Sequence, residues 1–107
     1  MPGLEDQIRD QLVTRLGLIE PGLKFLESNY HLRNPSGADG FVDILAKDSS
    51  GLIVVIELKR ADSTARQALH EISKYTALLA SQRGVPVSGL RALVVSTTWH
   101  ELLVPLS

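Results

Sequence analysis

The stretch that decides the fold is Phe41-Val42-Asp43-Ile44-Leu45, followed after a short turn by Leu52-Ile53-Val54-Val55-Ile56-Glu57-Leu58-Lys59. The first segment is a short apolar run interrupted by one carboxylate. The second is rich in β-branched residues, which favour strands, and it ends in a carboxylate and an ammonium group. Because strand side chains alternate between faces, Glu57 and Lys59 should share one face and Leu58 should point to the other. Buried strands rarely end in such charges without a function.

This arrangement suits metal-dependent phosphate chemistry. Two carboxylates on neighbouring strands can share a divalent cation, and a nearby lysine can orient or deprotonate a water that attacks a phosphate. An isolated glutamate and lysine after an apolar run more often form a solvated strand edge or a surface ion pair. The order of the features favours chemistry: an aspartate, a turn, and then the glutamate and lysine on the next strand, with a helix on either side.

Several further segments accompany this pattern. They are Leu4-Glu5-Asp6-Gln7-Ile8, Leu18-Ile19-Glu20-Pro21-Gly22-Leu23, Gly40 before Phe41, Arg60 after Lys59, and Lys74-Tyr75 in the helix that follows. With them, the sequence resembles the PD-(D/E)XK nuclease superfamily over roughly residues 4 to 80. The match is closest to the catalytic domain of NucS-type endonucleases, and more distant to archaeal Holliday-junction resolvases and RecB-type nuclease domains. The resemblance implies a restriction-endonuclease-like fold and a metal-dependent endonuclease acting on DNA.

Composition indicates a single ordinary globular domain. The chain has 107 residues, 44% of them hydrophobic and 21% charged, so residues 1–107 form one domain, which the resemblance implies is nuclease-like, or part of a longer protein. It has no cysteine and therefore neither disulfides nor thiolate metal sites. No signal peptide or membrane-length apolar run is present, so we expect no membrane partner and a cytoplasmic protein.

The charge balance bears on nucleic-acid binding. A net charge of −1 and a pI of about 6.3 are unusual for a stand-alone nucleic-acid-binding domain. A bound metal would cancel part of the acidic cluster, and a second domain or a homodimer partner could supply phosphate contacts. We therefore expect this domain not to bind DNA tightly by itself.

The N-terminal part predicts a helix and three antiparallel strands. Leucine or isoleucine recurs every fourth residue from Leu4 to Leu16, which predicts an amphipathic helix over residues 3–16. Turn-forming residues at 34–37 and 48–51 separate strands expected at 23–32, 39–46 and 52–59.

The C-terminal part predicts a crossover. Helical periodicity over residues 63–82, with Asp62 or Ser63 as its cap, leads to an apolar strand at 90–96. We expect that strand to be parallel to a neighbour and buried in the sheet centre. Residues 98–107 read as a helix introduced by a capping box, or as a short strand; a helix there would indicate a cut-out domain or a missing extension. The fold class is thus α/β, with a mixed sheet of four to five strands flanked by helices.

We assign the site residues as follows. Asp43 and Glu57 are metal ligands for Mg²⁺ or Mn²⁺, with the carbonyl of Leu58 as a third ligand. Lys59 positions the attacking water or stabilises developing charge. A desolvated lysine beside a metal could also have a lowered pKa and act as the base, and the sequence leaves these roles open.

The resemblance also implies supporting residues on the two helices. An acidic residue of the first helix reaches the metal in the family, which points to Glu5; Glu5 could equally complement the helix dipole. A Q-x-x-x-Y pair on the following helix matches Tyr75, but Glu71 stands where glutamine is expected. Either Gln67, one turn earlier, takes that role or Glu71 adds a second carboxylate.

Two classes of function remain open. The first is a divalent-metal-dependent endonuclease acting on DNA, with RNA as an open alternative substrate. The second is an inactive nuclease-like module for nucleic-acid binding or protein association. Arg60, Arg66 and Lys74 flank the site and can contact phosphates or simply form a solvated face, whereas His31, His70 and His100 have no zinc-like spacing. The separate N-terminal DNA-binding and dimerisation domain of NucS-type enzymes has no counterpart here, so their mismatch specificity is not carried over.

Overall fold

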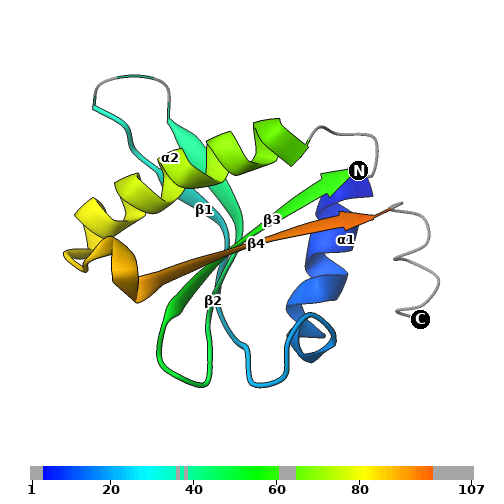
Figure 1. The fold of residues 1–107 in the computed structure, drawn as a ribbon. Helices are drawn as coiled ribbons and strands as arrows, with labels where there is room; N and C mark the ends of the chain where they lie inside the picture. Colours follow the sequence, from blue (N-terminus) through cyan, green and yellow to red (C-terminus); the bar gives the residue numbers. More distant parts are fainter. Residues whose placement is uncertain (1–3, 36, 38, 61–64, 98–107) are drawn as a thin grey trace.

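The protein folds as a four-stranded mixed sheet between two helices (Figure 1). The structure, a computed structural model, describes residues 4–35, 37, 39–60 and 65–97. Its elements in chain order are α1 (Leu4–Val13), the 3₁₀ turn η1 (Leu16–Leu18), β1 (Lys24–Leu32), β2 (Gly40–Lys47), β3 (Ile53–Arg60), α2 (Ala65–Arg83), the 3₁₀ turn η2 (Val87–Gly89) and β4 (Leu90–Thr97).

The sheet order is β1-β2-β3-β4. β1 and β2 are antiparallel, as are β2 and β3, while β3 and β4 are parallel. The α2 crossover accounts for the parallel pair, since a hairpin cannot join parallel strands. The predicted fold class, the antiparallel meander and the parallel final strand are therefore confirmed.

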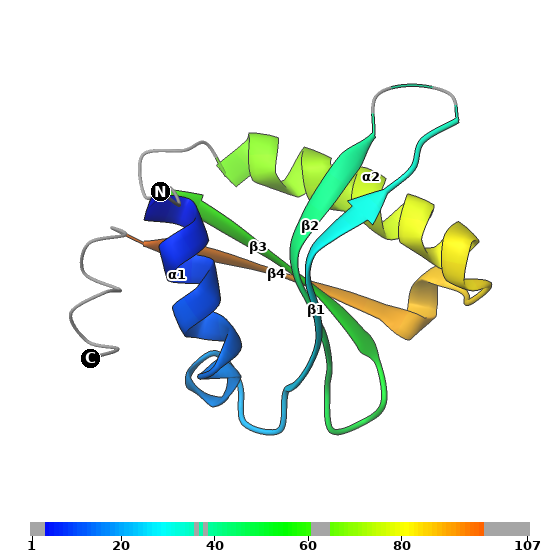
Figure 2. The ribbon, with the colours of Figure 1, turned by 180° about the vertical axis from the view of Figure 1, so that it is seen from behind.

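The two helices cover opposite faces of the sheet, as the two views of the ribbon show (Figures 1 and 2). On one face, Ile44 and Ile56 pack with residues of α1 in a first core cluster. On the other face, Leu45 and Val55 pack with Leu79 of α2 in a second cluster. Alternate strand residues thus enter different cores, which is why both strands read as nearly continuous apolar runs.

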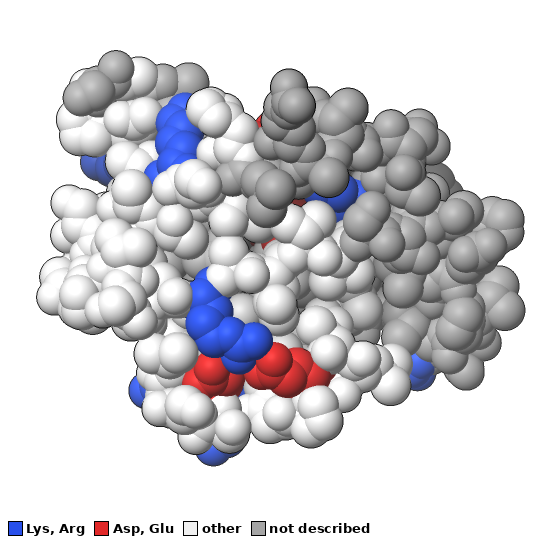
Figure 3. All heavy atoms as spheres, in the orientation of Figure 1, with Lys and Arg blue, Asp and Glu red and all other residues white. Residues whose placement is uncertain are grey.

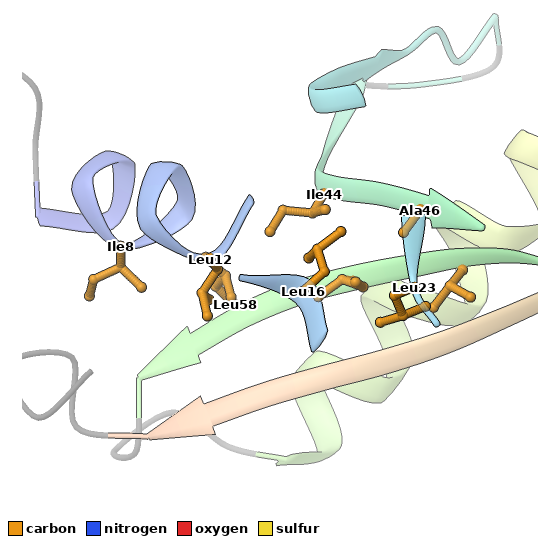
Figure 4. Packing of buried hydrophobic residues seen from close by; sticks show 9 residues of the cluster. Ile8, Leu12, Leu16, Leu23, Ile44, Ala46 and Leu58 are labelled. Atoms are coloured by element: carbon orange, nitrogen blue, oxygen red, sulfur yellow. The ribbon is translucent and has the colours of Figure 1, made fainter. Parts of the chain in front are cut away.

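The first helix ends earlier than its apolar spacing predicts. The α-helix stops at Val13, and the backbone continues through a turn into η1. Leu16 is still buried in the first core together with Ile8, Leu12 and Leu58 (Figure 4). The apolar spacing therefore predicted the burial of Leu16 correctly but placed the end of the helix too late. The 3₁₀ turn returns Leu16 to the buried face although the α-helix has already ended.

The prediction that the last strand lies in the sheet centre is wrong. Within the described sheet, β4 pairs only with β3 and lies at an edge. Leu93 and Val95 pack partly against the first core, whereas Val94 remains 36% exposed. Helix packing on alternate residues produces the apolar run, so the run did not require strands on both sides. The predicted tail element and the Asp62 or Ser63 cap lie outside the described residues.

The β2–β3 turn forms as its sequence predicts. Oδ1 of Asp48 accepts the backbone N–H groups of Ser50 and Leu52, and Gly51 has a positive φ of 91°. Such a φ is easy for glycine and strained for other residues. Within the described residues, no helix is long and apolar enough to cross a membrane.

The sheet opens at Asp43. Backbone pairing between β2 and β3 ends at Ile44 and Ile56, beyond which β2 continues with β1 and β3 continues with β4. Opposite Asp43, Asn29 has a positive φ of 51°. Val42 packs in the α2-side core but Ile44 in the α1-side core, although strand residues two apart normally share a face. This bend lets the two strands diverge, as Figure 2 shows.

Candidate functional site

Asp43 and Glu57 lie on adjacent strands at the point where those strands separate. They occupy the positions next to the last backbone pair, Ile44 with Ile56. The backbone N–H of Leu58 donates to Oδ2 of Asp43 at 2.8 Å. The carboxyl groups of Asp43 and Glu57 lie close enough for each to affect the pKa of the other. The structure therefore brings the two predicted ligands together.

Burial disfavours the charged form of both carboxyl groups. Glu57 is only 4% exposed, and its Oε1 is buried without a hydrogen-bond partner. Burial, with the charge of Asp43 adding to it, raises the pKa of Glu57 to about 8. Burial also raises the pKa of Asp43, although the Leu58 N–H opposes this. A half-buried and a buried carboxyl group, one of them with an oxygen that makes no hydrogen bond, fit a divalent cation, whose charge would favour the ionised forms.

Lys59 lies beside the pair and faces α2, while Leu58 packs in the α1-side core, as the alternation predicted. The ammonium of Lys59 donates to Oε2 of Glu71 at 2.7 Å. Burial acts to lower the pKa of Lys59, but the hydrogen bond to Glu71 and the nearby carboxylates raise it overall. In the metal-free protein Lys59 is thus a charged group, which favours the positioning or charge-stabilising role over the base.

Of the two alternatives for the helix position, Glu71 is the side chain that the structure connects to the site. It does so through Lys59, with about a third of its own side chain exposed. Gln67 lies in α2 and Glu5 in α1, but both side chains are outside the described part of the structure. Their predicted roles therefore stay predictions, as does the role of the Leu58 carbonyl.

Tyr75 borders the site and rests on the backbone of Gly40. A Cβ added at Gly40 would lie 2.5 Å from a carbon of the Tyr75 ring. Burial, with the charges of Glu57 and Glu71, raises the pKa of Tyr75. The glycine before Phe41 is thus required for close approach of strand and helix.

The sequence reasoning missed Arg9 of α1. Its side chain is 15% exposed and forms ion pairs with Asp6 at 3.1 Å and, through Nε, with Asp10 at 3.7 Å, and the buried Nε makes no hydrogen bond. The positive charge of Arg9 also acts to lower the pKa of Asp43. The available signal was an arginine flanked by two acids on a helix already suspected of reaching the site.

Other polar residues do not extend the site. Among the described side chains, no three His, Cys, Asp or Glu residues form a group able to hold a metal ion. His31 instead pairs with Asp39 at the C-terminal end of β1. Lys74 is exposed on α2, and the side chains of Arg60 and Arg66 are outside the description. On the described part of the face in Figure 3, basic atoms are isolated and do not form a continuous basic surface.

A separate ion-pair cluster explains the Ile-Glu-Pro-Gly segment. Arg91 of β4 binds both carboxylate oxygens of Glu20, at 2.7 and 2.8 Å, and also contacts Oδ2 of Asp48 at 2.9 Å. The cluster joins the loop after η1, the β2–β3 turn and the start of β4. Glu20 therefore serves the fold rather than the site.

Comparison with known proteins places this architecture in a family. The family model described as "Endonuclease NucS C-terminal domain" matches residues 4–103. This chain belongs to the NucS C-terminal domain family. Endonuclease NucS of Thermococcus kodakarensis is 32% identical over 90 residues, which cover 84% of this chain and 33% of that protein.

Solved structures agree with the NucS assignment. A repair endonuclease from Pyrococcus abyssi matches with a TM-score of 0.70 and 25% identity, covering 98% of this chain and 44% of that one. A chain of an EndoMS–dsDNA complex matches with a TM-score of 0.67 and 27% identity, covering 95% and 41%. The resemblance to NucS-type endonucleases inferred from sequence is confirmed, whereas the matched family is described as the C-terminal domain and the expected catalytic nature of this domain stays a prediction. The chain covers only 33% to 44% of the length of these relatives.

Proposed function

We propose that this domain is a divalent-metal-dependent endonuclease that hydrolyses phosphodiester bonds in DNA. The observation that carries the proposal is the pair of the half-buried Asp43 and the buried Glu57, whose Oε1 has no hydrogen-bond partner, beside the ammonium of Lys59. The relatives support DNA as the substrate, because one is named an endonuclease, one a repair endonuclease, and one was solved with double-stranded DNA.

In this proposal Asp43, Glu57 and the Leu58 carbonyl hold Mg²⁺ or Mn²⁺. When bound, such a cation lowers the pKa of a water and stabilises charge on the phosphate. Partial ligation by the protein leaves other coordination positions for water and substrate oxygens. The pair is preorganised for this, since the Leu58 N–H already fixes one carboxylate oxygen of Asp43.

Lys59 would orient the water and stabilise negative charge on the phosphate. Its contact with Glu71 holds the ammonium in place and keeps it protonated. Glu71 then acts through Lys59 as a positioning residue, and Tyr75 closes the α2 side of the site. Glu5 and Gln67 are proposed as further supporting residues from their places in α1 and α2.

A second candidate is a nuclease-like module that binds nucleic acid or another protein without cleaving it. The net charge of −1 and the scattered basic atoms in Figure 3 favour the protein-binding form of this alternative, because they offer few contacts to phosphates. Under either proposal, residues 1–107 act as one domain, and a second domain or a homodimer partner would add contacts to the phosphate backbone.

Cleavage assays separate the candidates. Labelled DNA and RNA, each single-stranded, duplex or branched, are incubated with the chain and Mg²⁺ or Mn²⁺. We expect DNA cleavage that is lost in Glu57→Gln and retained in Glu27→Gln, a control that alters an exposed carboxylate on β1. Cleavage of neither polymer, with Mn²⁺ binding equal in wild type and Glu57→Gln, would favour the inactive module. Cleavage of RNA alone would reassign the substrate.

A further inference from the structure

An exposed aromatic pair lies on the strands that lead into the site. Phe41 of β2 is 51% exposed and stacks on His31 of β1, with ring centroids 4.9 Å apart and an interplanar angle of 20°. The two residues are direct cross-strand partners. Cross-strand pairing of this kind stabilises a hairpin, but it does not require that half of a phenylalanine remain in solvent.

Asp39 holds the imidazole of the pair in place. Nε2 of His31 is 2.8 Å from Oδ2 of Asp39, while Oδ1 of Asp39 accepts the backbone N–H of Asn34 at 2.8 Å. Each carboxylate oxygen of Asp39 therefore has a partner, and the imidazole is fixed beneath the Phe41 ring. A fixed aromatic surface loses little conformational entropy when a second planar group stacks on it.

The position of the pair relates it to the proposed catalytic residues. Phe41 precedes Asp43 by two residues, which is roughly 7 Å along an extended strand. Cationic groups lie nearby: Arg33 lines an open hollow of about 410 Å³ together with His31 and Asp39. On the opposite side of the same hairpin, Arg83 lies 5.6 Å above the ring of Tyr30.

We propose that the Phe41–His31 pair is a stacking platform for a nucleobase of the strand whose phosphate reaches Asp43 and Glu57. This proposal rests on the proposed function for the nature of the polymer. A base offers the flat π-face that the ring can cover, and the attached phosphates find positive charge at Arg33. A protein partner would bury a broader apolar area, whereas the described residues that line the hollow beside His31 are polar or charged except for Pro35.

The test measures stacking and affinity without cleavage. The 107-residue chain is titrated into fluorescein-labelled single-stranded DNA in Ca²⁺, and anisotropy gives Kd. A parallel titration uses DNA with 2-aminopurine, whose fluorescence changes when the base stacks on an aromatic ring. We expect Phe41→Ala to raise Kd between about 5-fold and about 100-fold and to remove the 2-aminopurine signal.

Two variants make the comparison specific. Phe25→Ala removes another exposed phenylalanine, 43% exposed and paired with Ala46 at the far end of the same two strands, and it should leave Kd and signal unchanged. Phe41→Trp keeps a stacking ring and should retain both. Circular dichroism spectra and melting temperatures check that all variants are folded.

The outcomes distinguish this proposal from the proposed function. If Phe41→Ala has the Kd and the 2-aminopurine signal of wild type, or if wild type gives no such signal, the stacking proposal is wrong. This holds whether or not the chain cleaves DNA. If Phe41→Ala loses affinity and signal while wild type shows no cleavage with Mn²⁺, the platform stands and catalysis is wrong. Equal losses in Phe25→Ala and Phe41→Ala would also overturn the platform.

Discussion

The backbone N–H of Leu58 donates to Oδ2 of Asp43 across the gap where β2 and β3 separate. Next to this gap, the two strands are joined by the backbone pairing of Ile44 with Ile56. A carboxylate thus takes the place of a backbone acceptor at the end of the ladder. Asp43 therefore belongs both to the proposed metal site and to the hydrogen bonding of the sheet.

Asparagine and alanine at Asp43 should consequently differ. Asp43→Asn keeps an oxygen acceptor for Leu58, so we expect its stability to remain near that of wild type while cleavage is lost. Asp43→Ala leaves a buried N–H unpaired and should cost about 1–3 kcal/mol. Urea unfolding in EDTA measures the difference; equal stability of the two variants would contradict a structural role for the Leu58 contact.

Glu57 should make the metal-free protein less stable as pH rises. Its folded pKa of about 8 lies above the ordinary value of 4.5, so between these values the folded state retains a proton that the unfolded state has lost. Stability therefore falls across this window. Glu57→Gln should remove that slope and gain at least about 1 kcal/mol at pH 8. Urea unfolding at several pH values in EDTA tests this, and parallel curves for both proteins would be inconsistent with it.

Divalent metal should reverse this instability. A ligand that binds only the folded state adds about 2.7 kcal/mol at a hundredfold excess over its Kd. We expect Mn²⁺ to raise the Tm of wild type and of the control Glu27→Gln, but not of Glu57→Gln or Asp43→Asn. Differential scanning fluorimetry gives the shifts, and a rise of the same size in all four proteins would show that the metal binds elsewhere.

Glu71 should act through Lys59. Lys59→Gln should lower the cleavage rate on the order of 100-fold, and Glu71→Gln about tenfold. Because Glu71 raises the pKa of Lys59, its removal should also move the basic limb of the pH–rate profile to lower pH.

A double-mutant cycle gives the control for that pair. In the Lys59→Gln background, Glu71→Gln should have little further effect, since its partner is already absent. Independent, multiplicative losses would mean that Glu71 has a separate role.

A side chain at Gly40 should disturb Tyr75. The added methyl group of Gly40→Ala would lie 2.5 Å from the ring, so we expect a loss of about 1–3 kcal/mol from overpacking. The same substitution in a Tyr75→Ala background should cost much less, because the ring that it meets is gone. Thermal unfolding of the four proteins measures this coupling, and an equal cost in both backgrounds would contradict the close approach.

Local patterns account for the parts that could be predicted. The Asp48–Gly51 turn, the β-branched run of β3 and the placement of Glu57 and Lys59 on one face follow from backbone preferences and the alternation of a strand. The adjacency of Asp43 and Glu57 followed from the same information. Two strands joined by a short turn pair with each other, so the strands that carry these residues had to be neighbours. A relationship to NucS-type endonucleases was likewise visible in short segments of sequence.

Contacts between distant residues could not be predicted this way. Arg91 binds Glu20 across 71 positions of the chain, and Arg9 reaches the neighbourhood of Asp43 from another layer. The edge position of β4 depended on which strand β3 paired with, and the bend at Asp43 depended on Asn29 in the opposing strand.

The sequence by itself determined the strands, their faces and the kinds of side chain available for chemistry, since these depend on neighbours along the chain. Tertiary structure alone decided that Glu57 is buried with an unpaired oxygen, that Lys59 is held by Glu71, and that Phe41 stays in solvent against His31. The physical reason is that burial and charge pairing depend on distances in space between residues far apart in sequence, and these distances arise only when the sheet and helices pack.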